Sequence, residues 1–280
     1  MILSFHPCFS GNKNILCAGR EPDAKDLATI KAAAAVILPQ GCTASLYQMA
    51  RDNCPNVFPN YTARFKYRNK MGQILLFRET GTPHPDTLIH DHLSSFFAGS
   101  EGRKDSNPMP YPFVFKFDWG GEGDTVFLIR SREEFEPLLE KARGFEKTGH
   151  SGFLLQEYVP SQGRTLRVVV MYKKIITYWR AQADPDSFGS ALSKGATIDA
   201  DSDPLLQQEA AVLVKVFCEK TGIDLAGFDL MYSSRDRSFL FLEINYYFGR
   251  QGLGGSEKFY ALLGKQIRAW IRDQGLSLRK

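Results

Sequence analysis

The segment from Phe113 to Val126 limits the fold of this chain more than any other part of the sequence. Apolar residues alternate with Lys116, and three glycines then separate this run from a second apolar one. The order is typical of two strands joined by a flexible turn. Lys116 shares a strand face with Val114 and Asp118, because alternate residues of a strand point the same way. Since burying an unpaired ammonium is costly, we expect an anion such as phosphate beside it.

The glycines of this turn are Gly120, Gly121 and Gly123. Their backbone N–H groups can close over phosphate oxygens as an anion-binding nest. No GK[ST] follows, and the next element reads as a strand, so the segment is neither a Walker A loop nor a dinucleotide fingerprint. Taken alone, it is equally compatible with a plain glycine hairpin whose lysine faces solvent.

Three oxygen-bearing side chains lie in apolar strands near the C-terminus. Asp229 falls within Ala226–Met231, and Glu243 and Asn245 fall two apart within Phe239–Asn245. Residues two apart share a strand face, so a pairing of the two strands brings all three together. Such hard oxygen ligands suit Mg²⁺, with Mn²⁺ as an alternative. Any one of them alone reads more readily as a satisfied structural residue.

The remaining chain alternates helical and strand patterns, which favours two α+β units rather than one doubly wound sheet. An alanine-rich helix, the apolar run Val36–Leu38 and a turn-rich boundary near Asn53–Asn60 indicate a small α/β layer first. Ser131 and Glu134 form a capping-box pattern. Helices are expected at Asn69–Thr80, Asp86–Phe97, Ser131–Arg143, Pro204–Thr221 and from about Ser256. Strands are expected at Pro112–Phe117, Thr125–Arg130, Gly152–Val159, Leu166–Met171, Ile175–Arg180, Gly227–Tyr232 and Phe239–Asn245, with a polar loop through Asp201.

Composition narrows the functional classes. The 280 residues carry a net charge of +4 without the basic run that marks nucleic-acid binding. The N-terminus has no basic leader and no apolar stretch reaches membrane-span length, so we expect a cytoplasmic protein that binds no membrane. Five cysteines without a CxxC pair argue against a disulfide framework or zinc site.

Together these motifs resemble the ATP-grasp superfamily, and within it the RimK-like ligases that add glutamate to a ribosomal protein. The resemblance runs from about Arg68 to Leu253. Asn69-Lys70 and Gly81-Thr82-Pro83-His84-Pro85 match the helix that carries the family's first phosphate-binding lysine, with Asn in place of Asp. The residues that the resemblance assigns to nucleotide binding are Lys70, Lys116, Gly120, Gly121, Gly123 and the hinge Gln156, Glu157, Tyr158 and Val159.

The resemblance also implies an α+β ATP-grasp fold, in which two α+β subdomains enclose ATP behind a short α/β N-terminal domain. The expected boundaries are 1–60, 61–157 and 158–280. Asp229, Glu243 and Asn245 match the magnesium ligands. Arg167, Arg180 and Lys194 match cations that face phosphate and substrate, although exposed strand arginines are the plainer alternative.

Several positions depart from the family pattern. Thr165 replaces an acid after the hinge, and Ala191 and Ser193 replace asparagine and histidine in the substrate-selecting segment. Tyr246-Tyr247-Phe248-Gly249 replaces Ser-Ser-Pro-Gly. The nucleotide chemistry therefore carries over more fully than glutamate addition does.

The resemblance implies an ATP-dependent, ADP-forming carboxylate–amine ligase that works through an acyl phosphate. Its partners would be ATP, a carboxylate substrate and an amine acceptor, which is an amino acid, a peptide or a protein terminus. The alternative is a non-catalytic ATP-binding protein with an eroded substrate pocket. Ligases that make D-alanine dipeptide or glutathione remain rivals, and a homo-oligomer is left open.

Overall fold

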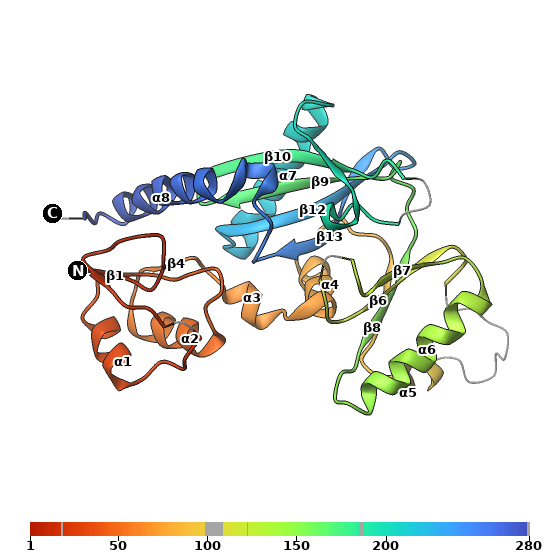
Figure 1. Ribbon diagram of the computed structural model, residues 1–280, viewed down its shortest axis with the longest axis horizontal. Helices are drawn as coiled ribbons and strands as arrows, with labels where there is room; N and C mark the ends of the chain where they lie inside the picture. Colours follow the sequence, from red (N-terminus) through yellow and green to blue (C-terminus); the bar gives the residue numbers. More distant parts are fainter. Residues whose placement is uncertain (18, 99–108, 122, 185–187, 279–280) are drawn as a thin grey trace.

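The computed structural model describes residues 1–17, 19–98, 109–121, 123–184 and 188–278. Within these ranges the strands form three sheets, each covered by helices (Figure 1). The N-terminal sheet is parallel, in the order β2-β1-β3-β4. Its elements are β1 (Ile2–Ser4), β2 (Lys13–Asn14), α1 (Ala24–Lys31), β3 (Ala35–Ile37), α2 (Ala44–Asn53) and β4 (Val57–Phe58). This is the α/β layer that the alanine stretch and the run from Val36 predict.

The middle sheet is antiparallel, in the order β5-β8-β6-β7. Phe113, Phe115 and Phe117 of β6 pack with α6 in one hydrophobic cluster. The alternate residues Val114 and Lys116 face the other way and line a cavity. The elements are α3 (Thr62–Lys66), α4 (Asn69–Thr80), β5 (Thr87–His90), α5 (Leu93–Ala98), β6 (Phe113–Phe117), β7 (Val126–Ile129), α6 (Arg132–Glu146) and β8 (Phe153–Glu157).

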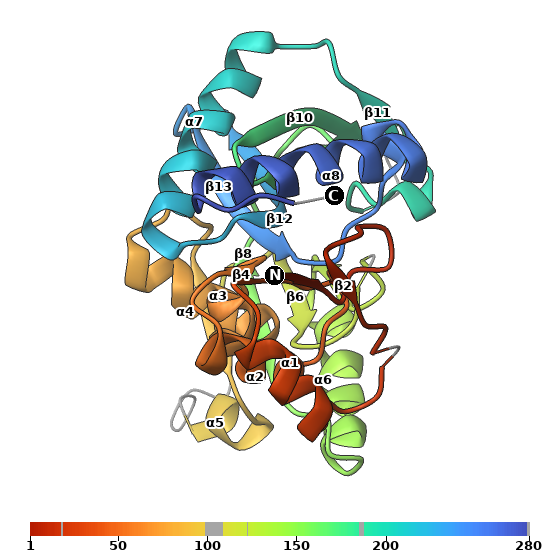
Figure 2. The ribbon, with the colours of Figure 1, turned by 90° about the vertical axis from the view of Figure 1, so that its left-hand side faces the viewer.

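The third sheet has the order β11-β10-β9-β12-β13 and is also antiparallel. Helix α8 runs along one side of this sheet, toward the N-terminal sheet (Figure 2). The elements are β9 (Arg164–Met171), β10 (Lys174–Ala181), the short 3₁₀ turn η1 (Leu192–Lys194), β11 (Thr197–Asp199), α7 (Pro204–Thr221), β12 (Leu225–Ser233), β13 (Ser238–Asn245), the 3₁₀ turn η2 (Gln251–Leu253) and α8 (Gly255–Asp273).

Strict alternation divides the two faces of this sheet. Leu166, Val168 and Val170 of β9 belong to the large core that also holds residues of α4 and α7. Val169 and Met171 point the other way and pack with α8. Arg167 has the parity of the α8 side, so its guanidinium emerges on the face that leads into the cavity.

An irregularity in β13 decides which face its polar residues occupy. Asp229 pairs with Glu243 but Leu230 pairs with Phe241, so Leu242 is an extra residue in β13. A regular strand would place Glu243 on the face of Phe241, inside the core. The extra residue reverses the alternation, and Ile244 joins Phe241 in the core while Glu243 lines the cavity.

Three local predictions are wrong. Asp86–Phe97 is not one helix: β5 pairs with β8, with Thr87 opposite Gln156, and only Leu93–Ala98 is helical. Tertiary pairing overrides the local pattern here. Ser131 makes no capping hydrogen bond, and Glu134 accepts the N–H of Arg130 instead. The expected polar loop contains η1 and β11, an edge strand that pairs with β10.

The fold agrees with the predicted α+β class. The boundaries 1–60, 61–157 and 158–280 remain a prediction, and each sheet lies inside one of these ranges. No helix in the described part of the chain combines the length and the apolar character needed to cross a membrane.

The first turn of α4 is held by Asp118, a buried residue from the loop after β6. One carboxylate oxygen accepts the backbone N–H of Met71 at 2.7 Å, and the other accepts the side-chain amide of Asn69 at 3.1 Å. Asn69 tolerates its φ of 59° better than most residues. Asp118 therefore caps the helix from outside, with its negative charge at the N-terminus.

We predict that Asp118→Ala lowers the free energy of unfolding by about 1–3 kcal/mol, because the Met71 N–H loses its charged partner. Urea denaturation followed by circular dichroism measures the change. Asp201→Ala, at an exposed aspartate, serves as the control and should stay within about 0.5 kcal/mol of wild type. Equal stability of the two variants would contradict the capping role.

Candidate functional site

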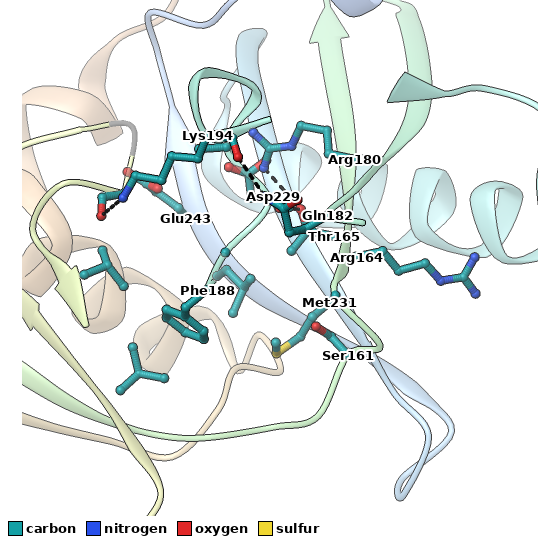
Figure 3. Close-up of a pocket in the computed structure, with 18 of the residues that line it drawn as sticks. Ser161, Arg164, Thr165, Arg180, Gln182, Phe188, Lys194, Asp229, Met231 and Glu243 are labelled. Carbon is teal, nitrogen blue, oxygen red and sulfur yellow. Dashed lines mark hydrogen bonds and ion pairs between the residues drawn. The ribbon is translucent and has the colours of Figure 1, made fainter. Parts of the chain in front are cut away.

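A cavity of about 890 Å³ lies between the middle and C-terminal sheets. Figure 3 shows side chains from both sides of it, with Lys194, Arg180, Asp229 and Glu243 around one end and Phe188 and Met231 at the other. The predicted site residues that line it are Lys70, Lys116, Gly121, Gly123, Gln156, Glu157, Tyr158, Val159, Arg167, Arg180, Lys194, Asp229, Glu243 and Asn245. Gly120 is not part of the lining.

The hinge after β8 offers unused backbone groups. Within the described ranges, the N–H and C=O groups of Tyr158 and Val159 make no hydrogen bonds. The side chain of Gln156 is committed elsewhere, donating to Thr87 Oγ1 at 2.9 Å. Glu157 pairs with Arg235 of the β12–β13 turn, with Oε1 2.8 Å from Nη1. The free edge is therefore backbone, which suits a planar base that carries both donors and acceptors.

Apolar side chains from both sheets face this edge. Val114, Val126 and Leu128 come from the middle sheet, and Met231 and Leu242 come from the C-terminal sheet. They form two walls between which an aromatic ring would be desolvated. Of these residues, sequence reasoning missed Met231 and Leu242: Met231 shares the face of Asp229 by its spacing of two within β12, whereas Leu242 reaches the cavity only through the irregular pairing of β12 with β13.

Two lysines occupy the opposite end. Lys116 has no hydrogen-bond or ion-pair partner in the described part of the chain, and burial lowers its pKa to about 8. The carboxylate of Glu243 opposes this shift and the charge of Lys70 adds to it. Since Lys116 faces the cavity, the alternative of a solvent-facing hairpin lysine is wrong. An anion at this place would keep its ammonium charged.

Lys70 holds the glycine turn in place. Its Nζ donates to the carbonyl of Trp119 at 2.8 Å and to that of Gly120 at 3.2 Å. Burial lowers its pKa as well, against the attraction of Glu243 and Asp118. Gly120 itself has a φ of +84°, a conformation that other residues rarely adopt.

Lys194 connects the turn to the C-terminal sheet. Its Nζ donates to the carbonyl of Gly123 at 2.8 Å and lies 3.7 Å from a carboxylate oxygen of Asp124. The backbone carbonyl of Lys194 accepts from Gln182 at 2.8 Å, which anchors the residue to the end of β10. The glycine turn is thus held from both sides of the cavity mouth.

The acidic group lies on β12 and β13. Asp229 and Glu243 are directly opposite in the strand register, and the Asn245 amide donates to Asp229 Oδ2 at 3.1 Å. Burial raises the pKa of Glu243, and the nearby charge of Asp229 raises it further against Lys70 and Lys116. Burial alone would also raise the pKa of Asp229, but Arg167 and Arg180 outweigh it and hold that pKa low.

The oxygen set fits a hard divalent cation. Among the described residues, Glu243 has no hydrogen-bond or ion-pair partner, so its carboxylate is free to bind one. No group of three His, Cys, Asp or Glu side chains in those residues could hold a metal, and here the third donor would be the amide oxygen of Asn245. Two carboxylates and one amide suit Mg²⁺ that keeps other positions for phosphate oxygens and water.

The two arginines converge on Asp229. Arg167 Nε lies 2.6 Å from Oδ1 and Arg167 Nη2 3.1 Å from Oδ2, a bidentate buried pair. Arg180 Nη2 lies 2.6 Å from Oδ1. Neither is an exposed strand arginine, so that alternative is wrong. In this arrangement the guanidinium of Arg167 acts through Asp229, as a positioning residue.

Thr165 occupies a position where the resemblance leads us to expect an acid, and its side chain contacts Ser190 and Arg180. Its hydroxyl forms a hydrogen bond with Ser190 and accepts from Arg180 Nη2 at 3.3 Å. Ser190 belongs to the segment whose pattern is eroded, and the structure places it beside the cavity. The hydroxyl pair therefore replaces an acidic contact with a neutral one.

The fold and this cavity define the class of protein. The ADP complex of purK, an N5-carboxyaminoimidazole ribonucleotide synthetase, superposes with a TM-score of 0.63 at 14% identity, covering 95% of this chain and 67% of that one. The RimK domain protein ATP-grasp from Sphaerobacter thermophilus DSM 20745 gives 0.60 at 13% identity, covering 95% and 98%. These likenesses show an ATP-grasp fold, which confirms the predicted architecture.

The sequence narrows the class to a family. The model of the RimK-like ATP-grasp domain matches residues 73–270. The chain therefore belongs to the RimK-like ATP-grasp family. A probable alpha-L-glutamate ligase of Serratia proteamaculans (strain 568) is 31% identical over 167 residues, or 59% of this chain and 51% of that protein. The chain spans about half the length of this relative.

The lowered pKa of Lys116 predicts a pH dependence of nucleotide binding. Below about pH 8 the free protein carries a charged Lys116, and above it the ammonium loses its proton. ATP affinity should therefore be flat at lower pH and fall by up to about tenfold per pH unit above pH 8. Calorimetry across this range, at fixed Mg²⁺, measures the slope.

Lys116→Arg is the informative variant, because arginine stays charged throughout the range. It should bind ATP with a flatter pH profile, while the exposed Lys215→Arg should keep the wild-type slope. Parallel profiles for wild type and Lys116→Arg would show that another group controls the binding.

Proposed function

We propose that this chain is an ATP-dependent carboxylate–amine ligase of the ADP-forming, acid–amino-acid type. The observation that carries the proposal is the opposition, within one cavity, of Lys70 and Lys116 to Asp229, Glu243 and Asn245. Polyanionic triphosphate needs both sets, since lysines neutralise its oxygens directly and carboxylates hold the cation that bridges them. The free backbone of Tyr158 and Val159 would bind the adenine edge.

In the reaction that we propose, an oxygen of the substrate carboxylate attacks the γ-phosphorus of ATP. The bond to the β–γ bridging oxygen breaks, ADP leaves and an acyl phosphate forms. The amine nitrogen then attacks the acyl carbon, phosphate leaves, and the amine proton passes to solvent. Lys116 and Lys70 stabilise charge on the transferred group, and Lys194 keeps the glycine turn over it.

Asp229, Glu243 and Asn245 would hold Mg²⁺, which supplies charge neutralisation on the phosphates when it is bound. Arg167 orients the Asp229 carboxylate for this purpose. The relatives' name makes L-glutamate the first amine to test, with a free or peptide carboxylate as the acid. The replacements at Thr165, Ala191 and Ser193 are what favours the non-catalytic alternative, and the retained Asp229, Glu243 and Asn245 count against it.

The first prediction of this proposal concerns nucleotide binding. Wild type should bind ATP more tightly with Mg²⁺ than without, and Glu243→Ala should lose most of that gain, because one charged ligand is removed. Calorimetry with and without Mg²⁺ measures both. Glu209→Ala, at an exposed glutamate of α7, should behave as wild type does. A Glu243→Ala protein with full magnesium dependence would sink the assignment.

The second prediction concerns catalysis. Phosphate release should require ATP, a carboxylate and an amine together, and mass spectrometry of the product should show a new amide bond. Lys116→Ala should reduce the rate by about 10²-fold or more, because a preorganised cation at the developing charge is lost. ATP binding without release for any acid and amine pair would favour the non-catalytic alternative.

A further inference from the structure

The carboxylate of Asp229 has no room for another ligand in this structure. Oδ1 accepts from Arg167 Nε at 2.6 Å and forms an ion pair with Arg180 Nη2, also at 2.6 Å. Oδ2 accepts from Arg167 Nη2 and the Asn245 amide, both at 3.1 Å. A carboxylate offers about four lone-pair positions, and four donors fill them. A cation can therefore reach Asp229 only if one donor leaves.

The four contacts are not held equally. Arg167 faces Asp229 directly across the β9–β12 pair, binds it through two nitrogens and is buried. Its guanidinium also packs over Gly227, where an added Cβ would lie 3.0 Å from Nη1. This pair is built into the register of the sheet, so Arg167 is the least free to move.

Arg180 is held far less firmly. It comes from β10, on the far side of β9 from Asp229, and its Nη2 lies 2.6 Å from Oδ1 of the carboxylate. Its Nη2 also donates to the neutral Thr165 hydroxyl at 3.3 Å. Its Nε is buried without a partner in the part of the chain that the structure describes. An unsatisfied buried donor weakens the hold of the protein on this conformation.

We propose that Arg180 is a placeholder for the divalent cation at Asp229. Its guanidinium neutralises the carboxylate until the cation arrives with the nucleotide, and it then swings into the cavity as an arginine free to bind an anionic group of the substrates. The inference rests on the proposed function, because it assumes that Asp229 becomes a metal ligand. It adds an order to that site: metal binding releases the arginine.

Charge explains why such a device is useful. Asp229 and Glu243 are neighbours, and without a cation their repulsion is relieved by Arg167 and Arg180 at Asp229 and by Lys70 and Lys116 at Glu243. When a divalent cation replaces one guanidinium at Asp229, the anionic nucleotide that comes with it keeps the net charge of the site balanced. A cation that arrives without the nucleotide should bind weakly, because it must displace the charge-assisted contact between Arg180 and Asp229.

The placeholder role of Arg180 can be tested by measuring Mn²⁺ binding in the absence of nucleotide. Electron paramagnetic resonance quantifies the bound ion. Wild type should bind Mn²⁺ weakly, and Arg180→Gln should bind it about tenfold more tightly or better, because the competing charged hydrogen bond is gone. Adding Asp229→Asn to that variant should abolish the gain. Unchanged or weaker binding to Arg180→Gln would overturn the proposal.

Arg164→Gln is the matched control. Arg164 lies on the neighbouring strand but pairs with Asp203 at 2.6 Å and covers the ring of Trp179 at 4.2 Å. Figure 3 shows its side chain directed away from Asp229. Its variant should bind Mn²⁺ as wild type does, so an equal gain in both variants would reduce the effect to general charge and overturn the placeholder.

A wild-type measurement covers the case in which Arg180→Gln does not fold. The Nε–H resonance of Arg180, assigned with Arg180→Lys, should shift when Mg²⁺ and a nonhydrolysable ATP analogue are added, while that of Arg164 stays. No shift at saturation would refute the release of Arg180. Failure of wild type to bind Mn²⁺ even with ATP would instead remove the proposed function, so the two failures are distinguishable.

Discussion

The alternation of the C-terminal sheet is the constraint on which the rest of the site depends. One face of β9, β12 and β13 carries the large apolar core, and the other carries the buried charged groups Arg167, Asp229 and Glu243. The extra residue Leu242 makes this possible in β13, because it turns Glu243 away from the core and opposite Asp229. A one-residue change of register would bury a carboxylate among aromatic side chains, which is far more costly than an irregular ladder. The bulge is therefore a condition for having both a stable sheet and an acidic cluster.

The charges of the cavity form two groups that face each other. Arg167 and Arg180 compensate Asp229 through direct contacts, whereas Lys70 and Lys116 act on Glu243 only through space. The charges of Lys70, Lys116 and Glu243 are less well stabilised than that of Asp229. Burial lowers the pKa of both lysines and raises the pKa of the glutamate. Perturbed groups that converge in a cleft are the expected mark of a binding site, because the missing stabilisation is supplied by the ligand. On the proposed function, the negatively charged polyphosphate would meet the two lysines, and its cation would meet the glutamate.

Sequence alone predicts the elements that have strong local signals. The helix Pro204–Thr221 is predicted from a proline at its start and Gly222 directly after its end, and the structure gives it the same bounds. Parity within a strand also predicts that Lys116 shares a face with Val114, and both line the cavity, whereas the expectation that Lys116 and Asp229 share one site comes from the family resemblance. The bulge at Leu242 cannot be read, since it depends on pairing between two strands. Asp118 is missed for a related reason: its partner helix lies 47 residues away in sequence, and no local pattern links them. The prediction also misses strand β5, because the extended conformation of Thr87–His90 depends on its pairing with β8.

The replacement at Thr165 connects the site to the question of what the chain uses as substrate. An acid at that position would lie beside Arg180 and compete with Asp229 for the guanidinium. With threonine there, the hydroxyl offers a single neutral contact, and Arg180 takes Asp229 instead. The loss of one negative charge leaves the arginine with a net attraction for anions once a cation satisfies Asp229. If the proposed function holds, a pocket lined by both this arginine and Lys194 would favour a substrate with a second carboxylate over a neutral one. On the proposed function, the replacements in this segment would change which acid or amine is preferred, while Arg180 and Lys194 would still be present to hold it.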